Sequence, residues 1–219
     1  MNKMVLSKPT LIMLYGFPGA GKTHFARQLS EAISIAHVNG DRIRYELFDK
    51  PRYDKQENDV VTHLMQYMAE EFLQAGVSVI YDTNAMRLGQ RRALRDAARK
   101  VHAHPLLIWL QIDPESAKVR ISGRDRRKSD DRYADPNDKV DFEANTKQMQ
   151  NPHNEDYIVI SGKHTFNTQK GAVLKRLYEL GLISSDSATT KVIKPGLVNL
   201  VPNAQAGRVD MTRRNIVIR

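Results

Sequence analysis

The stretch that decides the fold reads Gly16-Phe17-Pro18-Gly19-Ala20-Gly21-Lys22-Thr23. It fits the pattern G-x-x-x-x-G-K-S/T, in which glycines let the backbone wrap closely around phosphate oxygens. The apolar run Thr10–Tyr15 before it predicts a buried strand, and the apolar spacing of residues 22–34 predicts a helix after it. A strand, a glycine-rich turn and a helix N-terminus are the context that such a phosphate loop requires. The sequence therefore predicts that the chain binds a nucleoside triphosphate.

The loop also indicates which side chains would contact that ligand. Lys22 would reach the β- and γ-phosphates, and the hydroxyl of Thr23 would bind Mg²⁺. We therefore expect ATP and Mg²⁺ as cofactors. All residues of the loop are candidate nucleotide-binding residues, namely Gly16, Phe17, Pro18, Gly19, Ala20, Gly21, Lys22 and Thr23.

Apolar runs of strand length alternate with segments of helical spacing through most of the chain. Further strands are predicted at residues 35–38, 77–81, 105–112 and 157–160. Further helices are predicted at about 60–75, 89–100, from Pro114 onward, at 140–150 and at 170–180. The alternation predicts an α/β fold with a mostly parallel sheet and helices on both faces. A polar loop is expected at 125–136.

The composition changes after residue 183. Residues 184–190 are small and polar, and beyond them proline and glycine separate short apolar runs. We expect one domain at 1–183 and a basic C-terminal extension at 184–219. Lys and Arg number 34 against 25 Asp and Glu, a net charge of +9, which suits a polyanionic partner such as a nucleic acid, a nucleotide or membrane headgroups. Simple solubility is the alternative explanation of this charge.

Other features of the composition exclude several classes of protein. The chain of 219 residues has no cysteine, which excludes a disulfide framework, a cysteine zinc site and a thiol nucleophile. The longest apolar runs, 11–15 and 106–110, are too short to span a bilayer, so no integral membrane association is expected. No secretory signal is apparent, and the expected location is cytoplasmic.

Two aspartates follow predicted strands, where ligands bind in open α/β folds. Asp82 comes directly after the strand at 77–81, and its carboxylate could hold the metal through water, so Thr23 and Asp82 are the candidate metal residues. Capping of the next segment is the alternative. Asp41 follows the strand at 35–38, and Arg44 would share a face with it in a helical turn. Asp41 could accept a hydroxyl proton while Arg44 holds an anionic acceptor. The alternative is an N-cap aspartate with a surface arginine.

A third candidate group is basic. Arg120 and Arg124 lie one helical turn apart, and Arg126, Arg127 and Lys128 follow. Phosphoryl transfer needs cations on the triphosphate, which are often supplied by a closing lid. A solvated charged face is the other interpretation.

These pieces together resemble the P-loop kinases that include phage-type polynucleotide kinases and zeta-toxin-like small-molecule kinases, AAA-type proteins predicted to bind ATP. The matching pieces are the loop 16–23, Asp41 with Arg44, the run 79–84, Arg91 with Arg92, and Arg120 with Arg124. The resemblance covers about residues 10–180. Ala85 and Met86 stand where the family usually has a leucine, and the extension has no counterpart that is recognised.

The resemblance implies a three-layer P-loop fold with a five-stranded parallel sheet of order 2-3-1-4-5 and a basic lid. It implies Asp41 as general base, Arg44 on the acceptor and Arg124 as a catalytic residue with Lys22. Thr83 and Asn84, in the matching run, become candidate substrate-binding residues, and Arg120 joins Arg124 on the nucleotide.

Three functions fit these features. The first is an ATP-dependent kinase acting on a hydroxyl, with the 5′-hydroxyl end of a polynucleotide as one acceptor. The second is a small-molecule kinase for a sugar, nucleoside or antibiotic. The third is an ATP-binding switch whose basic tail docks on a nucleic acid or a membrane. Asp41 favours an enzyme, because a pure switch needs no base for an acceptor hydroxyl.

Overall fold

The computed structural model describes residues 3–125 and 132–183. Arg126, Arg127 and Lys128 of the expected lid lie outside the described residues, as does the extension at 184–219. The boundary at residue 183 therefore stays a prediction.

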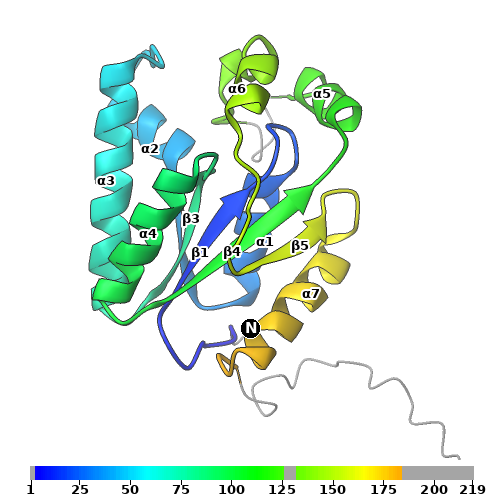
Figure 1. Ribbon diagram of the computed structural model, residues 1–219. Helices are drawn as coiled ribbons and strands as arrows, with labels where there is room; N and C mark the ends of the chain where they lie inside the picture. The colour runs from blue at the N-terminus through cyan, green and yellow to red at the C-terminus, as the bar shows by residue number, and fades with distance from the viewer. Residues whose placement is uncertain (1–2, 126–131, 184–219) are drawn as a thin grey trace, which may run out of the picture.

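A five-stranded parallel sheet forms the centre of the molecule (Figure 1). Its strands are β1 (Thr10–Tyr15), β2 (Ile35–Asn39), β3 (Ser78–Asn84), β4 (His104–Gln111) and β5 (Tyr157–Ser161). They are arranged in the order β2-β3-β1-β4-β5, so the predicted order 2-3-1-4-5 is confirmed. β1 pairs with β3 on one side and with β4 on the other, which places the phosphate loop at the middle of the sheet.

Helices cover both faces of this sheet, as predicted. They are α1 (Lys22–Ala32), α2 (Gly40–Leu47), α3 (Lys55–Gln74), α4 (Leu88–Lys100), α5 (Pro114–Ser122), α6 (Phe142–Gln148) and α7 (Phe166–Glu179), with a short 3-10 helix, η1 (Pro136–Lys139). Figure 1 shows α3 and α4 on one face of the sheet, α1 and α7 on the other, and α5 and α6 beyond the carboxyl ends of the strands.

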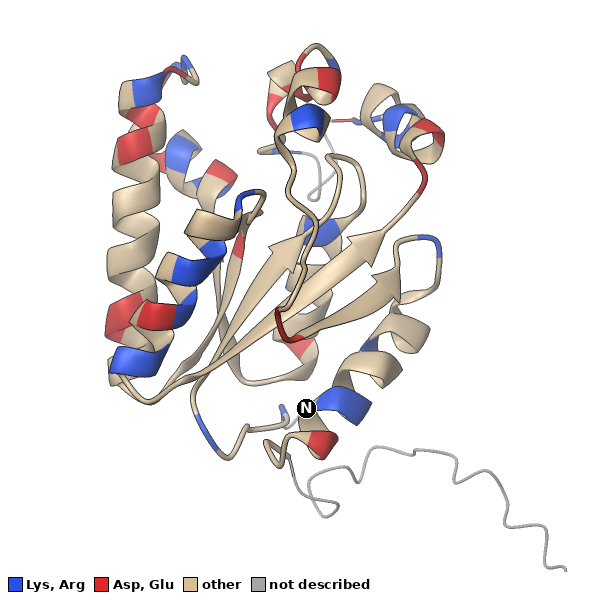
Figure 2. Ribbon diagram, viewed as in Figure 1, with Lys and Arg blue, Asp and Glu red and all other residues tan. Residues whose placement is uncertain are grey.

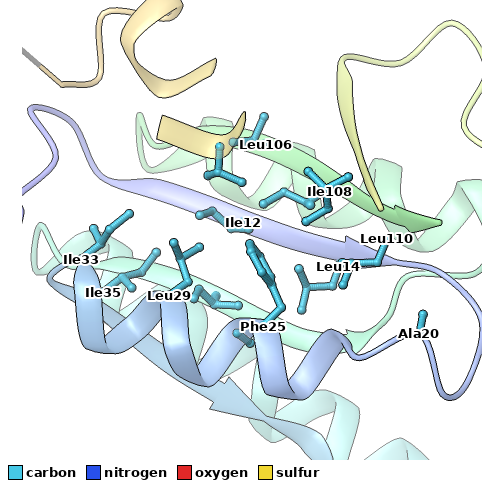
Figure 3. Close-up of a cluster of buried hydrophobic side chains, with 14 of the residues drawn as sticks. Ile12, Leu14, Ala20, Phe25, Leu29, Ile33, Ile35, Leu106, Ile108 and Leu110 are labelled. Atoms are coloured by element: carbon cyan, nitrogen blue, oxygen red, sulfur yellow. The ribbon is translucent and has the colours of Figure 1, made fainter. Parts of the chain in front are cut away.

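Successive residues of β1 bury their side chains in opposite layers, which explains why this strand is apolar throughout. Ile12 and Leu14 pack against Phe25 and Leu29 of α1 (Figure 3). Leu11 and Met13 lie in the other layer, with residues of α3 and α4. The strand that delivers the loop is thus held from both sides.

Two differences from the sequence-based predictions bear on the site. The helical turn considered for Asp41 and Arg44 belongs to a full helix, α2, which was not predicted because its short sequence begins with glycine and has little apolar periodicity. Its N-cap is Asn39, whose side chain accepts a hydrogen bond from the Arg42 N–H at 2.7 Å. Strand β3 extends to Asn84 instead of ending at Tyr81, since Asn39 of β2 pairs with Asp82 in the sheet. Asp82 therefore lies within a strand and does not cap the next helix.

The strands carry almost no charge, which is confined mainly to helices and connections (Figure 2). No helix in the described ranges combines the length and apolar character needed to cross a bilayer.

Candidate active site

The phosphate loop joins β1 to α1 and leans on two backbone carbonyls. A Cβ atom at Gly16 would lie 2.4 Å from the Leu110 oxygen, and one at Gly19 would lie 2.5 Å from the Ala117 oxygen. Gly19 also has a φ of +79°, which side chains rarely tolerate. Glycine is therefore required at both positions by close approach to β4 and α5, and this fixes the curvature of the loop.

The N-terminus of α1 is open to an anion. Its cap is Gly21, which provides no side-chain capping hydrogen bond. By contrast, α2, α3 and α5 are capped by the side chains of Asn39, Asp54 and Asp113. The first N–H groups of a helix need partners, and phosphate oxygens can supply them. The loop thus fits a phosphate group.

Lys22 lies inside the loop it belongs to. Its Nζ donates to the carbonyl oxygens of Gly16 and Phe17, at 2.9 Å each. Burial lowers the pKa of Lys22 to about 8, against the opposing effect of Asp138 and Asp82. A buried ammonium with a lowered pKa is short of negative charge, which phosphates would provide.

Thr23, in the first turn of α1, meets Asp82 of β3, so the two candidate metal residues lie together. The Thr23 hydroxyl donates to Asp82 Oδ1 at 3.3 Å. The other oxygen, Oδ2, accepts a hydrogen bond from Asn39 Nδ2 at 2.6 Å and lies 2.8 Å from His37 Nε2. These neighbours orient the carboxylate toward the loop.

This donor set fits Mg²⁺ bound together with a nucleotide. Among the residues in the described ranges, no group of three or more His, Asp or Glu side chains is arranged to hold a metal ion by itself. Mg²⁺ usually keeps several waters and binds through one or two protein oxygens and the substrate phosphates. A threonine hydroxyl beside one carboxylate is that kind of site.

Asp41 lies in the first turn of α2, near these groups. Burial, together with the carboxylates of Asp82, Asp138 and Asp135, raises its pKa to about 7 against the opposing effect of Arg44. A carboxyl group with a pKa near neutral can take up and release a proton at physiological pH. The N-cap alternative for Asp41 is wrong, because Asn39 holds that position.

Arg44 is buried, with 6% of its surface exposed, so the alternative of a surface arginine is also wrong. Its Nη1 donates to Glu57 Oε2 at 3.1 Å, its Nη2 donates to Asn58 Oδ1, and its guanidinium lies 4.7 Å from the centre of the Tyr53 ring. Both of its Nη atoms are thus engaged by α3. Only Nε, which is buried, has no hydrogen-bond partner among the described residues.

The two residues after Asp82 differ in their surroundings. Thr83 is exposed at the end of β3. The Oδ1 atom of Asn84 accepts a weak hydrogen bond from the Gly16 N–H at 3.4 Å. Asn84 therefore supports the start of the phosphate loop, and its predicted contact with substrate stays a prediction.

The two arginines of α5 and its C-terminus lie toward the loop. Arg120 is exposed, and its Nη1 would be 3.9 Å from a Cβ at Gly21. Arg124 Nη1 donates to Asp138 Oδ2 at 2.6 Å. Both cations are thus near the expected phosphates, although Arg124 already has a carboxylate partner.

Several residues of the site were missed in the sequence. His37 and Asn39 lie on β2 and reach Asp82 because β2 and β3 are adjacent, a neighbour relation that spacing alone does not reveal. Asp135 and Asp138 lie in a polar segment without periodicity. The one signal for them in the sequence is the run of aspartates around the predicted lid. Sequence spacing alone does not show that these aspartates lie near Lys22.

Solved structures of several P-loop kinases share this fold at low sequence identity. A gluconokinase from Sinorhizobium meliloti 1021 has 14% identity and a TM-score of 0.57, covering 82% of this chain and 95% of its own. The Mycobacterium tuberculosis APS kinase CysC, solved with AMPPNP and APS, has 14% identity and a TM-score of 0.57, covering 78% and 98%. Chaetomium thermophilum Kti12, solved with ADP-AlF3, has 14% identity and a TM-score of 0.59, covering 80% and 100%.

At these identities the likeness shows the fold alone, which is the predicted P-loop kinase-like fold. The narrower resemblance to polynucleotide kinases and zeta-toxin-like kinases stays a prediction. No curated protein matches the chain. The family model described as an AAA domain matches residues 11–150, which includes the phosphate loop, Asp41, Asp82 and Arg124. The chain therefore belongs to this AAA-domain family.

Proposed function

We propose that this protein is an ATP-dependent kinase that transfers the γ-phosphate of ATP to a hydroxyl group. The observation that carries the proposal is that three functional groups lie together at one edge of the sheet. They are the ammonium of Lys22 in the loop, the Thr23–Asp82 contact of 3.3 Å, and the carboxyl group of Asp41 with its pKa of about 7.

The loop and α1 would hold the phosphates. The N–H groups at the uncapped start of α1 and the ammonium of Lys22 bind the phosphate oxygens. Thr23 and Asp82 would hold Mg²⁺, which neutralises charge on the phosphates when bound. Arg120 and Arg124 would add positive charge on the nucleotide side.

Asp41 would act on the acceptor. The acceptor oxygen forms a bond to the γ-phosphorus as the bond from that phosphorus to the β,γ-bridging oxygen breaks, and ADP leaves. The hydroxyl proton passes to the Asp41 carboxylate, whose pKa of about 7 suits both accepting and releasing it. Arg44, through its unpaired Nε, would contact an acceptor that carries negative charge.

Two acceptor classes follow from different observations. The net charge of +9 favours an anionic acceptor such as the 5′-hydroxyl end of a polynucleotide. The gluconokinase and the APS kinase among the structural neighbours favour a small hydroxyl-bearing molecule. An ATP-binding switch without an acceptor is a third function, and Asp41 is the residue that argues against it.

The test uses γ-labelled ATP, Mg²⁺, and separate pools of 5′-hydroxyl oligonucleotides and cell metabolites. We expect label in one pool with the wild-type protein, none with Lys22→Ala, and undiminished label with Lys100→Ala, an exposed lysine on α4. Label that survives Lys22→Ala would refute the proposal. ATP binding without label in either pool would favour the switch.

A further inference from the structure

A carboxylate of η1 forms an ion pair with one of the cations that are expected to face the nucleotide. Asp138 Oδ2 accepts a hydrogen bond from Arg124 Nη1 at 2.6 Å. The side chains are largely shielded from water, with 22% of Arg124 and 19% of Asp138 exposed. Ion pairs of this kind are stronger than exposed ones, because less water competes for the charges.

The same carboxylate also acts on the phosphate loop. Among the charges that oppose the lowered pKa of Lys22, Asp138 has the largest effect, ahead of Asp82. It is also one of the carboxylates that raise the pKa of Asp41. Asp138 is therefore close to Lys22, Arg124 and Asp41 together, in the region where the phosphates of a nucleotide are expected.

Several contacts hold Asp138 in this place. The side chain of Asp135 caps η1 by accepting a hydrogen bond from the Asn137 N–H at 2.8 Å. The ring of Tyr133 packs against Tyr45 of α2, with 5.7 Å between the ring centres. The cap and the ring contact with α2 thus hold the segment in the position from which Asp138 reaches Arg124.

Asp138 resembles a phosphate in what it offers these cations. It presents an anionic oxygen to the guanidinium of Arg124, its negative charge acts on the ammonium of Lys22, and it lies among other carboxylates that repel it. Without the two cations, its position beside Asp41 and Asp135 would be unfavourable. Polyphosphate presents more negative charge to the same two side chains and would compete for them directly.

We infer that Asp138 is a built-in competitor of the nucleotide, which pairs with Arg124 beside the phosphate loop until a polyphosphate chain displaces it. The inference rests on the proposed function, because it concerns the regulation of the same site. Nucleotide affinity then depends on Asp138, which pairs with Arg124 of the nucleotide site and does not itself have to contact the nucleotide.

The experiment compares Asp138→Asn with the wild-type protein by calorimetric titration at constant ionic strength. The probes are MgATP, inorganic tripolyphosphate and adenosine. Removing the competing charge should tighten the binding of MgATP and of tripolyphosphate by about 10-fold each, the scale of one partly shielded ion pair, and leave adenosine unchanged. In an Arg124→Ala background, Asp138→Asn should give a smaller gain in affinity, because the cation that Asp138 pairs with is already absent.

The matched control is Glu143→Gln. It removes one negative charge from α6, where Glu143 is 65% exposed and pairs with Lys118 at 2.6 Å. Affinity should stay at the wild-type value. An unchanged or weaker affinity in Asp138→Asn, confirmed with Asp138→Ser, would overturn the inference, as would an equal gain in Glu143→Gln. A wild-type protein that binds tripolyphosphate but not ATP would instead contradict the proposed function.

Discussion

Two carboxylates of this protein, Asp41 and Glu155, have opposite environments. Asp41, at the start of α2, lies among Asp82, Asp135 and Asp138, and burial with these like charges raises its pKa to about 7. Glu155, before β5, is 3% exposed and accepts hydrogen bonds from Arg91 and Arg95. Although burial alone would raise the pKa of Glu155, the two arginines hold it below its ordinary value.

The difference lies in the donors around each group. Arg91 is fully buried, binds Glu155 through Nε and Nη2, and donates from Nη1 to the carbonyls of Ala85 and Met86 just beyond β3. That cluster is satisfied and ties the end of β3 to the segment before β5. Asp41 is held among acidic groups, an arrangement that costs stability and is typical of sites where protons move. The comparison teaches that burial alone does not separate structural from chemical carboxylates.

The largest effect is expected from Asp41→Asn. The substitution keeps the shape and removes the base, so turnover should fall by about 10²–10⁴-fold while ATP binding persists. Single-turnover rates and nucleotide titrations measure the two quantities. A near-normal rate would show that Asp41, like Glu155, has no part in the chemistry, and the contrast between the two carboxylates would be wrong.

The next effect concerns the satisfied cluster. Arg91→Ala leaves the buried carboxylate of Glu155 with fewer partners, so the free energy of unfolding should fall by about 3–5 kcal/mol. Denaturant unfolding measures it. Arg92→Ala, the exposed neighbour on α4, should change it by no more than about 0.5 kcal/mol. Equal effects of the two substitutions would show that the cluster stabilises nothing beyond a surface charge.

Arg44 belongs to both kinds of environment, because it binds Glu57 and lowers the pKa of Asp41. Arg44→Ala should lower Tm by several degrees, less than Arg91→Ala does, since Glu57 keeps the backbone N–H groups of Arg52 and Tyr53. It should also raise the acceptor KM and move the acid limb of the rate profile to higher pH. A larger effect on ATP binding than on the acceptor would contradict its assignment to the acceptor side.

The last expected effect, which develops only as the pH rises, is on stability. The pKa of Asp41 rises from 3.8 to about 7 on folding, so the native state binds more protons than the unfolded chain between these values. The free energy of unfolding contributed by Asp41 therefore falls as pH rises from about 4 to 7. Asp41→Asn should remove this loss and raise Tm at pH 8, by about 2–4 °C per kcal/mol, with little change at pH 4.

Thermal scans without nucleotide, in a chelator, measure this difference. The advantage of the variant should grow steadily between pH 4 and pH 8. An advantage that is the same at both pH values would mean that Asp41 is not held with a raised pKa.

Much of the fold followed from the sequence, because its signals are local. The loop 16–23, the apolar run of β1 and the strand–helix alternation depend on neighbouring residues and their periodicity, and they predicted the parallel α/β sheet with helices on both faces. The sheet order came from the resemblance. The full helix α2 was not predicted, since a short, charged helix that begins at an Asn-Gly pair has the local sequence features of a turn.

The electrostatic character of the site was decided only by tertiary structure. Glu57 of α3 binds the buried guanidinium of Arg44, and β2 brings Asn39 and His37 to Asp82. In the same way, η1 brings Asp138 to Arg124. Sequence named Asp41 as the candidate base, but its raised pKa depends on burial and on three other carboxylates, one from β3 and two from η1 and its cap. Residue types specify which chemistry is possible, whereas a pKa or an ion pair depends on distances and on exclusion of water, which exist only once the chain has folded.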